Sequence, residues 1–162
     1  MRQQVCALCL CLTLQLALAG CGLSKGMVKR ATRVAKVSSG KLSLHIVISD
    51  NANENSPVAV DVLFIKDKAF LKTVQGMSAS DWFMKKAQLQ RQNPKAMKVE
   101  SWEWVPKQNP NPDPIELLVP VDAQAALLFA NYNSAGPHSA ALPTKGKVTL
   151  DLGDEDFTVE SK

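Results

Sequence analysis

The stretch that decides the fold is Pro57-Val58-Ala59-Val60-Asp61-Val62-Leu63-Phe64. Its valines and its phenylalanine fall at every second position, which is the period of a β-strand whose alternate side chains share one face. The positions between them are also apolar except at Asp61, and a strand that is apolar on both faces is buried on both. The stretch therefore predicts a central strand of a sheet, with Pro57 at its start.

A second alternating stretch lies just before it, at residues 42–48. Its expected inward positions are Leu42, Leu44, Ile46 and Ile48. Between the two strands lies the run Asp50 to Ser56, which is rich in Asp and Asn and has the composition of a turn. We therefore expect a polar loop here, held by two strong strands.

Further alternating stretches follow along the chain. They are residues 101–105 with Trp102 and Trp104, residues 115–121, residues 125–132, residues 148–152, and a short last one at residues 157–159. Short strands at this spacing predict a mainly β protein, a β-sandwich of the immunoglobulin-like kind. The expected core includes Ile46, Val60, Val62, Leu117 and Leu150.

The period changes to that of a helix at about residues 67–92. Phe70 and Val74 fit one short helix, and Ser80 is the expected N-cap of a second one that ends at Asn93-Pro94. We expect Trp82 and Phe83 in this segment to be core residues. The domain of residues 41–162 is thus predicted to be a sandwich with a short helical insertion.

The N-terminus has the pattern of an export signal, residues 1–20. Arg2 supplies a positive charge, an apolar stretch follows, and the sequence Leu18-Ala19-Gly20-Cys21 resembles a bacterial lipobox. In such signals the cysteine is acylated and the peptide is cut before it. The alternatives are an ordinary signal peptide or a membrane anchor, although the apolar stretch is short for a span.

Cys21 is the expected site of lipidation. The other cysteines, Cys6, Cys9 and Cys11, lie inside the signal, so the mature chain would carry a covalent lipid and no disulfide. Residues 21–40 contain five basic side chains and no acidic one, and a sixth basic residue, Lys41, follows directly, which predicts a basic tether. Such a tether either rests on anionic head groups or is a solvated linker. Export, and the lack of interleaved aromatic residues, exclude nucleic acid as a partner.

No pattern of catalytic or metal-binding residues is found, so we expect no enzyme, no catalytic residues, no metal site and no cofactor beyond the lipid. His45 lies mid-strand, and His138 lies in a loop without an evident acid partner. Asp154-Glu155-Asp156 lacks calcium-ligand spacing and predicts a turn. The Pro- and Asn-rich loop 107–114 suits a spacer or a recognition loop.

The chain resembles the TssJ family of type VI secretion lipoproteins. The resemblance rests on the lipobox, on Asn55-Ser56-Pro57-Val58-Ala59-Val60-Asp61-Val62 after a polar loop, on helices headed by Phe70, and on Leu128-Phe129-Ala130-Asn131-Tyr132. Two departures from the family pattern, Pro106-Lys107 and Asn131-Tyr132-Asn133, indicate a divergent branch.

The resemblance implies a transthyretin-like sandwich anchored in the outer membrane and facing the periplasm, and Gly22 after Cys21 fits that location. It implies a partner, the periplasmic domain of the inner-membrane protein TssM. It also implies a docking loop, made of Asp50, Asn51, Asn53, Glu54, Asn55 and Ser56. Without the resemblance, the alternative interpretation of residues 50–56 is a plain solvated turn. The residues alone also leave open a lipoprotein that binds a small ligand in a pocket lined by Trp102, Trp104 and Tyr132. A third alternative is a lipoprotein enzyme, which would need two facing acids or a His–acid pair in a cleft.

Overall fold

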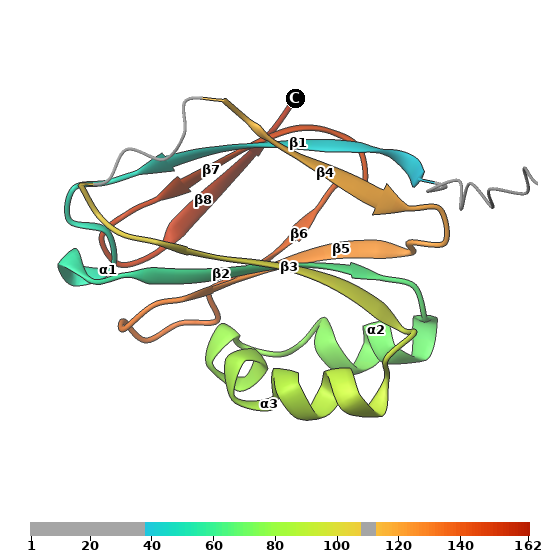
Figure 1. The fold of residues 1–162 in the computed structure, drawn as a ribbon. Coiled ribbons are helices and arrows are strands. Elements are labelled where there is room, and N and C mark those ends of the chain that lie inside the picture. The colour runs from blue at the N-terminus through green and yellow to red at the C-terminus, as the bar shows by residue number, and fades with distance from the viewer. Residues whose placement is uncertain (1–37, 108–112) are drawn as a thin grey trace, which may run out of the picture. The chain divides into compact units, whose positions relative to one another are not determined.

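Two four-stranded sheets pack face to face in the computed structural model, which describes residues 38–107 and 113–162 (Figure 1). The first sheet has the strand order β4-β1-β7-β8. Its strands are β4 (Ile115–Pro120), β1 (Ser38–Ile48), β7 (Gly146–Leu152) and β8 (Phe157–Ser161). Strand β1 pairs antiparallel with β4 on one side and parallel with β7 on the other, so it is an inner strand of this sheet.

The second sheet has the order β3-β2-β5-β6. Its strands are β3 (Met97–Trp104), β2 (Val58–Ile65), β5 (Ala125–Asn131) and β6 (Ser139–Leu142). Strand β2 is paired on both edges and almost wholly buried. The prediction of a central strand starting after Pro57 is therefore confirmed.

The main core lies between the two sheets. Alternate side chains of each strand point into it, as the two-residue period requires. All five expected core residues are buried there, with exposed fractions of 8% or less: Ile46, Val60, Val62, Leu117 and Leu150. The prediction of a mainly β sandwich is therefore confirmed, and so is the predicted burial of these five side chains.

Two helices, α2 (Lys68–Val74) and α3 (Ala79–Gln92), cover the outer face of the second sheet (Figure 1). A second buried cluster forms between them and the sheet, around Trp82 and Phe129, whose rings stack with centroids 5.4 Å apart. The prediction that Ser80 is the N-cap of α3 is wrong. Ser78 caps this helix, and its hydroxyl oxygen accepts a hydrogen bond from the Asp81 backbone N–H at 3.1 Å.

A buried carboxylate joins α3 to β2. Asp61, which is 1% exposed, accepts hydrogen bonds from Trp82 Nε1 at 2.7 Å and from Lys86 Nζ at 3.0 Å. A buried charge needs such partners, because an unpaired one is costly in an apolar surrounding. The polar position that interrupts the apolar run of β2 is therefore the attachment point of the helical layer.

Several element bounds differ from the prediction. Strand β1 begins at Ser38, so residues 38–40 are strand and not tether. Strand β3 begins at Met97, four residues early, and Val121 lies in a turn, 59% exposed. Strand β6 was not predicted, because its sequence Ser-Ala-Ala-Leu lacks the large β-branched residues that mark a strand.

Some predictions fall outside the described residues. These are the signal peptide at 1–20, the lipidation of Cys21, nearly all of the tether, and most of the 107–114 loop. Within the residues that are described, no helix has the length and apolar character needed to cross a membrane.

Candidate functional site

Three connections between strands meet at one end of the sandwich, which we call the loop end. They are residues 49–57 between β1 and β2, residues 132–138 between β5 and β6, and residues 153–156 between β7 and β8. They meet because β1 and β7 run parallel and end together, while Asn131 at the end of β5 pairs with Ala59 at the start of β2. The predicted docking loop is the first of these connections.

The backbone of the 49–57 connection turns sharply. Asn53, Glu54 and Asn55 all have positive φ angles, of 51°, 55° and 61°. Asparagine adopts this left-handed conformation more readily than other residues with a side chain, whereas Glu54 is strained there. Hydrogen bonds to the neighbouring turn hold the strained segment: Asn53 N donates to Gly153 O at 3.3 Å, and Glu54 N donates to Asp154 O at 3.2 Å.

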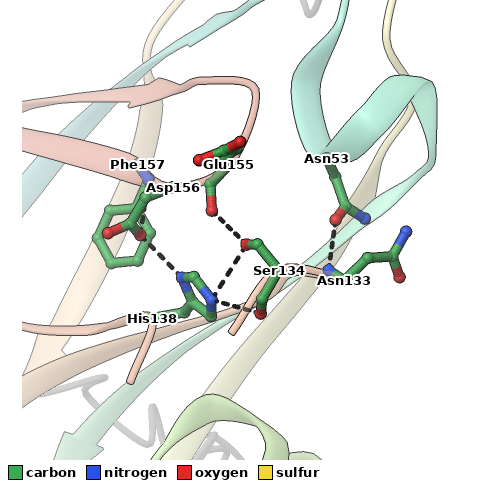
Figure 2. A network of polar contacts seen from close by, with 7 residues as sticks. All are labelled: Asn53, Asn133, Ser134, His138, Glu155, Asp156 and Phe157. Carbon is green, nitrogen blue, oxygen red and sulfur yellow. Dashed lines mark hydrogen bonds and ion pairs between the residues drawn. The ribbon is translucent and has the colours of Figure 1, made fainter. Parts of the chain in front are cut away.

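Asn53 is buried and not available to a partner. It is 2% exposed, and its Nδ2 donates to the Pro57 carbonyl oxygen at 2.8 Å. Its Oδ1 accepts a hydrogen bond from the Asn133 backbone N–H at 2.6 Å (Figure 2). Asn53 therefore positions the loop, while the other predicted docking residues lie at the surface: Asp50, Asn51, Glu54 and Asn55 are exposed and Ser56 is partly exposed.

His138 joins the other two connections of the loop end (Figure 2). Its Nδ1 lies 2.9 Å from Asp156 Oδ1, and its Nε2 lies 2.9 Å from the Ser134 carbonyl oxygen. A Cβ added at Gly136 would lie only 2.8 Å from His138 Cε1, so this turn needs glycine for the ring to fit. The prediction that His138 has no acid partner is wrong.

Ser134, His138 and Asp156 are the residue types of a hydrolytic triad, but their hydrogen bonds tie loops together. The Ser134 hydroxyl donates to the Glu155 carbonyl oxygen and lies 3.3 Å from His138 Nε2. Asp156 Oδ1 also accepts from the Phe157 backbone N–H at 2.8 Å. The His138 ring is 6% exposed and stacks on a buried tyrosine. The arrangement serves as a cross-link between the two connections.

The surface of the loop end is acidic. The three connections contain no lysine or arginine. Their acidic residues are all exposed: Asp50, Glu54, Asp154, Glu155 and Asp156. A partner that docks here meets a rigid, negatively charged edge that is rich in hydrogen-bonding groups.

The aromatic residues expected to line a ligand pocket belong to the core. Trp102 and Trp104 pack against the main cluster, and Tyr132 is part of it. Burial, and to a lesser extent the charges of nearby acidic residues, raises the pKa of the Tyr132 phenol. Three surface hollows of about 550, 520 and 320 Å³ are lined by other residues.

Metal binding has no support in the described part of the chain. No three His, Cys, Asp or Glu side chains there are placed to hold an ion together. The turn at Asp154–Asp156 instead joins β7 to β8, as predicted, and Asp154 accepts a hydrogen bond from the Ser49 hydroxyl at 2.7 Å. These carboxylates are therefore used in joining loops or lie at the surface.

The sandwich, with helices inserted after its second strand, defines the class: a transthyretin-like β-sandwich. Among solved structures, the chain is similar to the type VI secretion lipoprotein TssJ1 from Pseudomonas aeruginosa. The TM-score is 0.57 at 11% identity, over 76% of this chain and 96% of that one. The chain therefore has a TssJ-like fold.

Two further similarities point the same way. The first is to Serratia marcescens Lip, described as a membrane-bound component of the type VI secretion system. Its TM-score is 0.54 at 13% identity, over 75% of this chain and 97% of that one. The second is to a chain in a structure of the TssM C-terminal domain from EAEC, with a TM-score of 0.50 at 12% identity, over 75% of this chain and 98% of that one. No protein-family model matches the sequence, and neither does any curated protein.

Proposed function

We propose that this chain is a lipoprotein of a type VI secretion membrane complex. In this proposal Cys21 carries the lipid that holds it in the outer membrane, and the sandwich faces the periplasm and docks the periplasmic domain of TssM. The observation that carries the proposal is the TssJ-like fold. Its neighbours are described as secretion-system lipoproteins and components, and none of them is described as an enzyme.

The loop end supports docking because it is both exposed and pre-organised. Its backbone is cross-linked between the three connections, and a surface that is ordered before binding loses less entropy when a partner arrives. It also lies at the far end of β1 from Ser38, where the chain arrives from Cys21. A partner at the loop end would therefore leave the start of β1 uncovered.

The docking residues in this proposal are the exposed members of the predicted loop. They are Asp50, Asn51, Glu54, Asn55 and Ser56. Asn53 is a positioning residue that holds their backbone.

Titration calorimetry against the periplasmic domain of TssM tests the proposal. The variant carries Asp50→Ser, Asn51→Ser, Glu54→Ser and Asn55→Gly, and keeps Asn53. We expect the dissociation constant to rise by about tenfold or more while the fold is kept, since the changed side chains are exposed. A control with Gln88→Ala and Gln90→Ala on the exposed side of α3 should bind like the parent.

Unchanged affinity in the loop variant, with its fold intact by circular dichroism, would remove this loop from the interface. Absence of binding by the parent protein would remove TssM as the partner.

A further inference from the structure

The outer face of the first sheet changes from basic to acidic along its length. No helix covers this face (Figure 1), and its side chains are the outward members of each alternating strand. Near the start of β1 they include Lys41 and Lys147, whereas Asp151, further along β7, leads toward the acidic loop end. The two ends of one face therefore carry opposite charge.

Four lysines gather at the basic end, and we call them the lysine face: Lys41, Lys145, Lys147 and Lys162. Strand pairing brings them together. Lys147 lies beside Ser43 in the β1–β7 register, and its backbone exchanges hydrogen bonds with that of Lys162. A Cβ added at Gly40 would lie 3.5 Å from the Cβ of Lys145. All four lysines are exposed.

These lysines have no ion-pair partner within the described part of the chain, in contrast to Lys66, Lys85, Lys86 and Lys98. Glu116 and Glu160 are the nearest acids on the same face by strand register: Glu116 is opposite Ser43, and Glu160 is opposite Thr149. Four lysines against these two acids give the lysine face a net positive charge toward whatever lies against it.

We propose that the lysine face rests on the anionic phospholipid head groups of the membrane that anchors the chain. The inference rests on the proposed function in one respect, the lipid at Cys21. The position of the lysine face supports the inference: the lysines surround the start of β1, and residues 22–37 connect that strand to Cys21 in the sequence. Fully extended, these residues would reach roughly 55 Å, so the tether permits this contact without imposing it.

Contact through the lysine face gives the domain one orientation. The acidic residues at the loop end are repelled by the same head groups, so the loop end is directed into the periplasm. Each lysine near an anionic surface strengthens binding by about fivefold at physiological salt. The effect acts only within about 8 Å, so it requires the face itself, and not merely the tether, to approach the membrane.

Fluorescence quenching by labelled head groups tests the proposal on the mature, acylated protein in vesicles. Cys21 is acylated, so a dye attaches only to an introduced cysteine, either Thr144→Cys beside the lysine face or Ala135→Cys at the loop end. In phosphatidylglycerol-containing vesicles we expect strong quenching at residue 144 and little at residue 135. In pure phosphatidylcholine, or in about 0.5 M salt, the difference should largely vanish.

Charge reversal supplies the matched variants. The double variant Lys145→Glu with Lys147→Glu should remove the difference in quenching between the dyes at residues 144 and 135. The control is Lys72→Glu with Arg91→Glu, which makes the same change in net charge on exposed residues of the helical layer. It should leave the difference in quenching unchanged. Equal quenching of both positions in the parent protein, or equal effects of the two charge-reversed pairs, would overturn the proposal.

A separate measurement distinguishes a wrong lysine-face proposal from a protein that carries no lipid. If mass spectrometry finds no acyl group on the purified protein, the proposed function loses its anchor, and the same protein is then sedimented with vesicles. Retention by phosphatidylglycerol vesicles, lost on reversal of Lys145 and Lys147, would still support the lysine face. Absence of retention would overturn it.

Discussion

One side-chain amide, that of Asn53, holds two connections of the loop end in place. The amide donates a hydrogen bond to the Pro57 carbonyl oxygen and accepts one from the Asn133 backbone N–H. The backbone of Asn53 itself is in the left-handed conformation. A buried donor or acceptor that loses its partner costs the full desolvation of that group. The geometry of the exposed residues proposed for docking therefore depends on Asn53, which is itself buried.

We expect Asn53→Ala to lower the free energy of unfolding by about 2–3 kcal/mol, because it removes both hydrogen bonds of the buried amide and places alanine at a positive φ. Urea denaturation measures the loss. Asn51→Ala is the control, since this neighbour is exposed and should change stability by less than about 0.5 kcal/mol. Equal stability of the two variants would contradict the structural role given to Asn53.

The role of such residues could not be predicted from the sequence. The Asp- and Asn-rich composition of residues 50–56 correctly indicates a turn, but Asn53 finds one of its partners 80 residues further along the chain. In the same way His138 finds Asp156 on a separate turn. Composition and spacing report local structure, whereas these contacts are made by the folded sheets.

At the scale of elements, the helical layer is fixed to the sheet at Asp61. Trp82 and Lys86 lie one turn apart on α3, and both reach the same carboxylate on β2. Trp82 also stacks on Phe129 of β5, so α3 is held on two neighbouring strands. The helix is attached by a specific polar contact as well as by apolar burial.

Lys86→Met tests this attachment. The change leaves the buried charge of Asp61 with Trp82 as its remaining donor, so we expect stability to fall by about 3 kcal/mol. Lys85→Met is the matched control, because the adjacent Lys85 pairs with Asp81 at the surface and such pairs contribute little. Thermal denaturation of the two variants should show a clear fall for Lys86→Met alone; similar melting temperatures would mean that the buried pair does not hold α3.

Elements with large alternating side chains could be predicted well, and the others could not. Strands β1, β2, β5 and β7 follow from their valine, leucine and isoleucine periods. Strand β6 has small residues and depends on pairing with β5. The start of α3 was misplaced because Ser78 and Ser80 both suit a cap, and the choice is made by the contacts of the folded chain, among them the hydrogen bond from Ala79 N to the Pro137 carbonyl oxygen.

At the scale of the whole molecule, the start of β1 and the proposed docking surface lie at opposite ends of the sandwich. The chain enters β1 at Ser38 and leaves it toward the loop end after Ile48. The lysine face surrounds the entry point, and the acidic connections surround the exit. Lipid attachment and partner binding can therefore be tested separately by mutation.

Cys21→Ser is the test of the anchor. Without the thiol no acyl chain can be attached, so we expect no incorporation of labelled palmitate and a loss of the protein from the outer-membrane fraction. Cys11→Ser, inside the expected signal, is the control and should still be acylated and reach the membrane. Labelling that persists in Cys21→Ser, or a parent protein found in the inner-membrane fraction, would contradict the assignment.

The inner position of β1 determines how the domain carries a mechanical load. Tension between the segment before Ser38 and the loop after Ile48 would run along the covalent backbone of this one strand, which is roughly 36 Å long. Strand β4 pairs with residues 38–44 of β1 and strand β7 with residues 42–48, so neighbouring strands hold β1 extended along its whole length. A pull along this axis leaves the second sheet and the helices out of the force path, and the domain would act as a stiff link while the rest of its fold stays relaxed.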